Sequence, residues 1–194
     1  MSKRIGVFMD VSNLYYCCNQ RYQAKLNYKA YIDFIKDYGE VTQAIAYGAQ
    51  LKNEAKKFIT VLEHLGFQAK YKSPKTFEGV EGKLSIKRKA DWDVGIAIDI
   101  VQICLGVGVD TIFIGSADSD LTPVVQWAIS RGVTVVILAC GISRELKECA
   151  TKWIEIPESM MEGQEKPGVK GAVGDTGSVK EKVQDEKSTI ESAK

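Results

Sequence analysis

Four aspartates stand where apolar segments of the chain give way to a turn or to the start of a helix. Asp10 ends the first apolar run, Asp93 lies near the start of a long apolar segment, and Asp118 and Asp120 follow the run Thr111–Ile114. Carboxylate oxygens are ligands that hard divalent ions such as Mg²⁺ or Mn²⁺ prefer, and such an ion can activate water and stabilise charge on a phosphate. These residues therefore indicate metal-dependent hydrolysis.

The acids must lie close together for this chemistry. Apolar runs that end in a turn predict buried parallel strands, and the carboxyl ends of such strands are where open α/β sheets place ligands. Two carboxylates about 4 Å apart repel by about 4 kcal/mol at an effective dielectric near 20, so a bound cation would relieve them. In the alternative, each aspartate separately caps a helix or forms a turn. The density of hydroxyl and carboxyl groups over 116–120 exceeds what one cap needs.

Strand-like and helix-like segments alternate along the chain. We expect strands over 4–10, 41–47, 67–71, 111–114, 133–138 and 153–156, the last at the edge of the sheet. We expect helices over 28–38, 53–65, 91–105 and 143–149, with two more after Asp10 and Asp120. This alternation predicts an α/β domain whose mostly parallel sheet is covered on both faces. The helix over 91–105 is apolar over a wide arc, so we expect it to be largely buried.

The composition changes near residue 158. Residues 158–194 hold no aromatic residue, eight acidic residues and six lysines, a composition that cannot bury enough apolar surface to fold. We therefore predict a folded domain over 1–157 and a disordered polar tail over 158–194. No apolar run approaches the roughly 18 residues that cross a bilayer, so we expect no membrane partner and a cytoplasmic location.

Cysteine and histidine usage narrows the chemistry further. Five cysteines occur without a Cys-x-x-Cys pair, which favours reduced thiols over a disulfide framework or a zinc site. The single histidine, His64, lies in a helix-like segment and is expected to be a surface residue. Catalysis by a serine–histidine or cysteine–histidine pair is therefore not expected, and an enzyme of this composition would rely on carboxylates and a metal.

A basic run precedes the second group of acids. Alone it would indicate solvated surface, but beside an acidic metal site it predicts contacts to the phosphates of a polyanion. Asp99, between two isoleucines of an apolar helix, needs a partner of its own, because a buried unpaired charge is costly. The residues of the basic run that are predicted to bind these phosphates are Lys83, Lys87, Arg88 and Lys89.

Three motifs, in order along the chain, resemble those of the NYN domain family, LabA-like branch, within the PIN-like nuclease superfamily. They are Asp10-Val-Ser-Asn13, Asp93-Val-Gly-Ile-Ala-Ile-Asp99 and Gly115-Ser-Ala-Asp-Ser-Asp-Leu121. The resemblance covers roughly residues 4–156. It implies a three-layer α/β/α PIN-like fold and metal-dependent cleavage of RNA phosphodiester bonds. It also implies that Asp10, Asp93, Asp118 and Asp120 are the catalytic, metal-binding acids, and that Asn13, Asp99 and Ser116 form their supporting shell.

The chain departs from the family in one place. A Lys-Gly pair often precedes the second motif, whereas this chain has Ala90 and Asp91, and Asp91 is either an extra ligand in the supporting shell or a helix cap. The competing function is a non-catalytic RNA-binding or regulatory module, although retention of all four acids favours the enzyme. A phosphatase of the haloacid dehalogenase type is disfavoured, because Ser12 stands where that chemistry needs a second aspartate. The oligomeric state is open, and a homodimer is compatible with the sequence.

Overall fold

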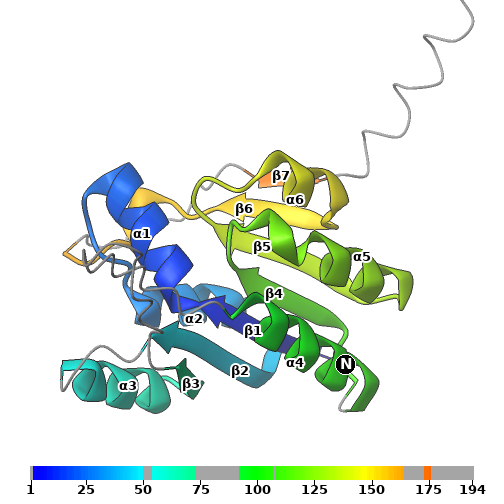
Figure 1. Cartoon of the computed structure of the whole chain (residues 1–194), viewed down its shortest axis with the longest axis horizontal. Helices are drawn as coiled ribbons and strands as arrows, with labels where there is room; N and C mark the ends of the chain where they lie inside the picture. Colours follow the sequence, from blue (N-terminus) through cyan, green and yellow to red (C-terminus); the bar gives the residue numbers. More distant parts are fainter. Residues whose placement is uncertain (1, 50–53, 73–91, 107, 164–172, 176–194) are drawn as a thin grey trace, which may run out of the picture.

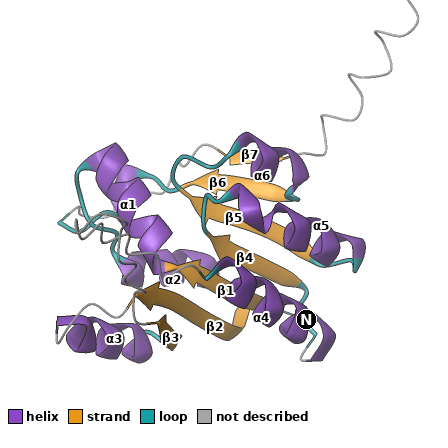
Figure 2. Ribbon diagram, viewed as in Figure 1, coloured by secondary structure: helices purple, strands orange, loops and turns teal. Residues whose placement is uncertain are grey.

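The structure is a computed structural model of the 194-residue chain and describes residues 2–49, 54–72, 92–106, 108–163 and 173–175. Helices and strands alternate through these residues, as the sequence predicts (Figures 1 and 2). The strands are β1 (Arg4–Asp10), β2 (Glu40–Ala49), β3 (Gln68–Lys72), β4 (Thr111–Gly115), β5 (Thr134–Ala139), β6 (Lys152–Glu155) and β7 (Val173–Asp175). The helices are α1 (Val11–Tyr22), α2 (Tyr28–Lys36), α3 (Glu54–His64), α4 (Asp93–Gly106), α5 (Thr122–Ser130) and α6 (Arg144–Cys149), with short 3₁₀ helices η1 (Ser119–Leu121) and η2 (Glu158–Met160).

The described strands form one sheet in the order β3-β2-β1-β4-β5-β6-β7. The first six are parallel to their neighbours, and β7 pairs antiparallel to β6. Right-handed crossovers place α4, α5 and α6 together on one face, in front of the sheet in Figure 1, and α2 and α3 on the other. The protein is therefore a three-layer α/β/α domain with a six-stranded parallel sheet, as predicted.

Strands β1 and β4 lie side by side at the point where the sheet order reverses. The chain leaves β1 toward β2 and leaves β4 toward β5, in opposite directions across the sheet. Met9 pairs in register with Gly115, so the two strands end together. A crevice outside the carboxyl ends of such a strand pair is the usual ligand site of an open α/β sheet. Three of the four predicted acidic residues, Asp10, Asp118 and Asp120, lie at these two strand ends.

The core explains why these strand ends are fixed. Every residue of β4 is buried, in keeping with its run of β-branched and aromatic side chains. Gly115 ends the strand where no larger residue fits, because a Cβ there would lie 2.5 Å from the Tyr31 hydroxyl and 3.1 Å from Leu14. Tyr31 is itself fully buried and donates a hydrogen bond to the Leu138 carbonyl at 3.1 Å. The loop after β4 therefore begins from a tightly packed position.

Two sequence expectations were wrong. The helix α4 is not largely buried: Val94 is 74% exposed and Ile98 is 51% exposed, because only the face that carries Ile96 and Ile100 packs on the sheet. The strand β6 is not an edge strand, because β7 pairs with its outer side. An apolar arc shows that a helix can be buried, but the neighbours that would cover it are set by the tertiary fold.

The packed chain also continues beyond residue 157, where the sequence places the end of the domain. Met160 and Met161 are both 1% exposed. The backbone N–H of Asn27 donates to the Met160 carbonyl at 2.8 Å, and that of Glu162 donates to the Lys25 carbonyl at 2.8 Å. Most of the predicted tail lies outside the described residues. In the described part of the chain, no helix has the length and apolar character needed to cross a membrane.

Candidate metal centre

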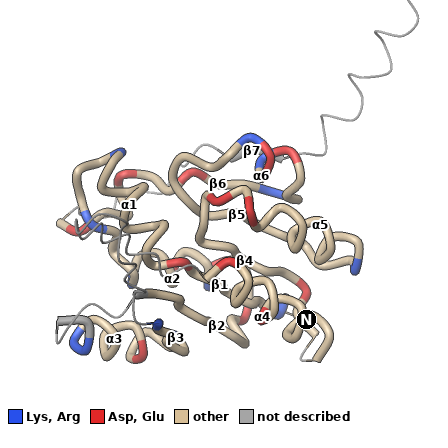
Figure 3. The backbone as a smooth tube through the Cα atoms, in the orientation of Figure 1, with Lys and Arg blue, Asp and Glu red and all other residues tan. Residues whose placement is uncertain are grey.

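Three of the four predicted aspartates meet at the carboxyl end of the sheet. Asp93 is the first residue of α4, Asp118 lies in the loop after β4, and Asp120 lies in η1. One carboxylate oxygen from each can be chosen so that all three lie within 4.8 Å of one another. Figure 3 shows acidic segments at the start of α4 and in the turn that leads to α5. Asp93 and Asp118 are half-buried and Asp120 is exposed, so the group is open to solvent on one side.

The loop that carries Asp118 and Asp120 is held by its own short hydrogen bonds. The fully buried Ser116 accepts the backbone N–H of Asp118 on its Oγ at 3.3 Å. Asp118 Oδ1 accepts the N–H of Asp120 at 3.1 Å and so caps η1. The predicted supporting role of Ser116 thus has a physical basis, because this side chain fixes the backbone on which a carboxylate is mounted. Asp118 has a second oxygen that this cap does not use.

Asn13 joins the acidic loop to α1. Its Oδ1 accepts the backbone N–H of Ala117 at 3.0 Å, across 104 positions of sequence. Asn13 is in turn placed by Asp10, whose Oδ1 accepts the Asn13 N–H at 3.0 Å and caps α1. Asp10 ends β1 beside Ser116, but it does not belong to the group of three acids whose oxygens lie within 4.8 Å.

Asp99 has other partners. It is buried in α4, accepts a hydrogen bond from the Tyr47 hydroxyl at 2.7 Å, and pairs with Lys70 Nζ at 2.8 Å. Burial is the largest cause that raises the pKa of the Tyr47 phenol, and the hydrogen bond to Asp99 and the charge of Asp99 raise it further. The buried charge of Asp99 is therefore paired with the Lys70 ammonium and hydrogen-bonded by the Tyr47 hydroxyl. The contacts of Asp99 therefore anchor α4 to β2 and β3.

Trp92, the residue just before Asp93, is held in place by several contacts. Its indole N–H donates to the Gly48 carbonyl at 2.9 Å, its ring packs against that of Tyr47 at 5.4 Å between centroids, and its carbonyl accepts the Ile96 N–H. Lys72 Nζ lies 3.9 Å from the centroid of the Trp92 ring. The first turn of α4, and with it Asp93, is therefore tied to the end of β2.

The acidic group lies between two hollows. A cavity of about 510 Å³ reaches Asp118 from the α1 side, and its lining includes Asn13, Tyr16 and Arg21. An apolar groove of about 590 Å³ reaches Asp120 from the other side, between α4 and α5. A polymer that crosses the acids would therefore meet polar and cationic groups on one side and apolar groups on the other.

A model of the NYN domain family matches residues 4–157, which is most of the chain. The chain belongs to the NYN domain family. A crystal structure of a protein of unknown function from Vibrio parahaemolyticus is similar, with a TM-score of 0.71 and 26% sequence identity, covering 82% of this chain and 96% of that one. No curated protein matches the chain in sequence. The fold and the family are thereby established, and the resemblance that the three motifs carry is confirmed at the level of the family.

Some predicted residues of this NYN domain cannot be compared with the structure. Asp91 and the basic residues Lys83, Lys87, Arg88 and Lys89 lie outside the described residues. The prediction for His64 is confirmed, since it is exposed in α3 with its Nδ1 2.7 Å from the Thr60 carbonyl. The five cysteines are free, as expected.

Sequence reasoning missed four residues that contact or surround the predicted aspartates. Tyr47 and Lys70 have no mark in the sequence beyond their places in strands, yet they are the partners of Asp99, and they are paired in register across β2 and β3. Trp92 adjoins an acidic motif, which was a usable signal for a positioning role. Arg21 gave no signal, because its place in the lining of the cavity that reaches Asp118 depends on the course of α1.

Proposed function

We propose that this NYN domain is a metal-dependent ribonuclease that hydrolyses phosphodiester bonds at the site formed by Asp93, Asp118 and Asp120. The observation that supports this most directly is the convergence of three carboxylates on one open rim, on a loop that Asn13 and Ser116 hold in place. Family membership adds a second, independent support. Within the family, we assign the chain to the LabA-like branch on its three motifs and expect it to act in the cytoplasm.

The donor set fits a hard divalent ion. All three side chains offer carboxylate oxygens, with neither histidine nor sulfur among them, which suits Mg²⁺ or Mn²⁺. When bound, such an ion supplies water of lowered pKa and neutralises charge on the phosphate under attack. Asp10, at the adjoining strand end, is proposed as a fourth contributor. Asp99 is better explained as an anchor of α4 than as part of the supporting shell.

The cavity beside Asp118 offers a path for single-stranded RNA. Arg21 is held at its rim by Glu155, with Nη1 3.2 Å from Oε2, and keeps further N–H groups for a phosphate. Tyr16 is 68% exposed and lines the same cavity, so its ring is available to stack on a base. We propose that Lys83, Lys87, Arg88 and Lys89 bind phosphates elsewhere along the path.

Cleavage of labelled single-stranded RNA in Mn²⁺, Mg²⁺ or EDTA tests the proposed activity. Wild type should cleave only with a divalent ion, and Asp118→Asn and Asp93→Asn should reduce the rate at saturating RNA by at least a hundredfold. Asp33→Asn is the matched control, since it neutralises an aspartate whose partner is Lys29 on α2. RNA binding without cleavage by wild type in every ion would instead establish the non-catalytic module.

Neutralising Lys87, Arg88 and Lys89 together tests the basic run separately. RNA binding should weaken alike for all sequences, because bonds to phosphates carry no base information. The slope of log affinity against log salt should become shallower by about 0.7 for each phosphate of the single strand that the variant no longer neutralises. Unchanged affinity would return these side chains to solvated surface.

A further inference from the structure

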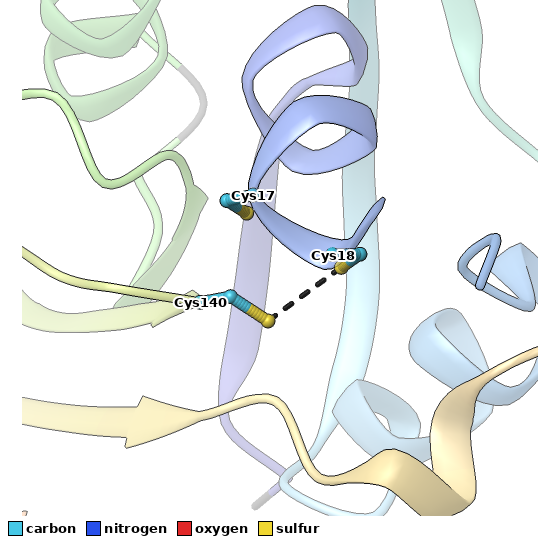
Figure 4. A group of neighbouring side chains, drawn as sticks. All are labelled: Cys17, Cys18 and Cys140. Atoms are coloured by element: carbon cyan, nitrogen blue, oxygen red, sulfur yellow. Dashed lines mark hydrogen bonds between the residues drawn. The ribbon is translucent and has the colours of Figure 1, made fainter. Parts of the chain in front are cut away.

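Three of the five cysteines come together away from the acidic group. Cys17 and Cys18 are neighbours on α1, and Cys140 follows the end of β5, 122 positions after Cys18. Figure 4 shows the side chains of Cys18 and Cys140 facing each other, with Cys17 one residue earlier on the same helix. Cys18 is fully buried, Cys140 is 1% exposed, and Cys17 is half-buried. The expectation of no zinc site rested on spacing along the chain, which does not reveal this arrangement.

The separations of the sulfurs match those of a metal–thiolate site. The three Sγ atoms all lie within 4.8 Å of one another, and Cys18 Sγ is 3.6 Å from Cys140 Sγ. A Zn–S bond is about 2.3 Å, so two sulfurs of a tetrahedral zinc site lie about 3.8 Å apart. The observed arrangement is therefore close to that of three corners of the tetrahedron, and small side-chain rotations complete it.

The contacts that the three thiols make in the metal-free protein are weak enough for a metal ion to replace them. Cys18 Sγ and Cys140 Sγ form a weak sulfur–sulfur contact at 3.6 Å. The other contacts are weak: Cys17 Sγ lies 3.4 Å from the Leu14 carbonyl, and Cys140 Sγ lies 3.9 Å from the Ile156 carbonyl. A metal ion would displace these weak bonds and the thiol protons, which pass to solvent.

The cluster also has access to solvent and room for a fourth ligand. Cys17 and Cys140 line the 510 Å³ cavity that reaches Asp118, whereas Cys18 closes the inner side. A structural zinc site has four protein ligands, while a site with three and an open position can bind water or a substrate group. The described residues supply three sulfurs, and the cavity leaves the fourth position open.

We propose that Cys17, Cys18 and Cys140 form a second metal site, which binds a thiophilic divalent ion such as Zn²⁺ through three thiolates with the fourth position facing the cavity. Soft sulfur ligands select Zn²⁺ over Mg²⁺ and Mn²⁺, so this site and the carboxylate site take different ions. The three-cysteine site shares the cavity with Asp118.

Absorption spectroscopy with Co²⁺ as the probe tests this site. The full chain, reduced and kept under argon, should show the sulfur-to-cobalt charge-transfer bands of a thiolate site with one Co²⁺ per chain. Zn²⁺ should then abolish these bands at equimolar concentration. Cys17→Ser and Cys140→Ser should each bind Co²⁺ at least a hundredfold more weakly, whereas Cys104→Ser and Cys149→Ser, which change half-buried cysteines outside the cluster, should match wild type.

Two further measurements keep the outcome interpretable. Cys17→Ser alters the most accessible thiol, so a thermal melt should show that it folds, and its loss of the cobalt bands then reports on binding. Asp118→Asn should retain the bands in full, which separates this site from the proposed ribonuclease centre. Wild type without charge-transfer bands, or a Cys18–Cys140 disulfide that forms when the protein is exposed to air in the presence of equimolar Zn²⁺, would overturn the assignment.

Discussion

The side-chain oxygen of Asn13 in α1 accepts the backbone N–H of Ala117, at 3.0 Å, directly before the two acids of the loop after β4. This bond joins the end of the first strand to the end of the fourth, and it is made by a side chain whose own backbone is bound by Asp10. The two strand ends therefore form one unit, in which a change on α1 is felt by Asp118.

Asn13→Ala should impair metal binding through a residue that need not touch the ion. The variant leaves the Ala117 N–H without its partner, which costs about 1–3 kcal/mol for a buried group and less for this half-buried one. We expect a modestly lower melting temperature and weaker Mn²⁺ binding by calorimetry. Asn19→Ala, at an exposed position on the same helix, is the control. A lower melting temperature with unchanged Mn²⁺ affinity would reduce Asn13 to a purely structural role.

Asp118→Asn should distinguish the effect of the Asp118 charge from the effect of the hydrogen bond by which Asp118 caps η1. The amide oxygen can still accept the Asp120 N–H, and loss of one charge relieves repulsion among the three acids, so the metal-free melting temperature should hold or rise. An ion at a hundred times its Kd stabilises wild type by about 2.7 kcal/mol. Mn²⁺ should therefore raise the melting temperature of wild type by about 5–10 °C and that of the variant by much less. A large metal-free destabilisation would show that Asp118 is mainly a cap.

Asp99→Asn should behave in the opposite way. The change removes the charge that Lys70 pairs with at 2.8 Å and weakens the acceptor of the Tyr47 hydroxyl, so we expect a loss of about 1–3 kcal/mol in unfolding free energy. Mn²⁺ affinity should stay within a factor of two. Tyr47→Phe, which removes one hydrogen bond and leaves the ion pair, should cost less. An unchanged melting temperature with a tenfold loss of Mn²⁺ affinity would restore Asp99 to the supporting shell.

The acidic group could be predicted from the sequence because its members follow apolar strands or begin a helix. The parallel sheet then places Asp118 beside the end of β1, and the buried run Thr111–Gly115 leaves no freedom in that placement. Asp99 was recognisable as a charge that needed a partner. Lys70 was not, because its position depends on the register of β3 against β2 rather than on any local pattern.

The cysteine cluster could not be predicted for a related reason. Cys17 and Cys18 are adjacent in sequence, but Cys140 reaches them only because β5 lies two strands away from β1 and its loop turns toward α1. The exposed face of α4 could not be predicted either, because apolar character alone does not measure burial. Val94 and Ile98 are apolar and exposed, since no described element covers that side of the helix.

Truncation should show where the packed domain ends. Removal of residues 158–194 takes away Met160 and Met161, which are buried and whose segment hydrogen-bonds to Asn27 and Lys25. Complete burial of a methionine contributes about 1.5–3 kcal/mol, so this truncation should lower the melting temperature by several degrees. Removal of residues 176–194 alone should change it little, since that sequence has no aromatic residue. Equal melting temperatures for the two truncations would place the boundary at 157.

The thiols of the metal-free protein should differ in how pH controls their reactivity. Hydrogen bonds from Cys140 and Cys18 lower the pKa of Cys17, whereas burial raises the pKa of Cys104. The thiolate is the reactive form, so the rate of alkylation of Cys17 by iodoacetamide in EDTA should depend less on pH between about pH 5 and about pH 8 than that of Cys104. Cys104 should instead react about tenfold faster for each pH unit, since its thiolate fraction rises in that proportion below the pKa.

Cys140→Ala supplies the control for this behaviour, because it removes the largest of the effects that lower the Cys17 pKa. Alkylation of Cys17 in this variant, followed by mass spectrometry of the labelled peptides, should slow near the acidic end of that range and depend more strongly on pH. The sign follows from the cause: fewer hydrogen-bond donors stabilise the thiolate less, so its pKa rises and less of it is ionised in acid. A Cys17 rate in wild type that rises in parallel with that of Cys104 would mean that the three thiols share no proton network. The metal site would then have to form from three neutral thiols, with a correspondingly steeper dependence of Zn²⁺ affinity on pH.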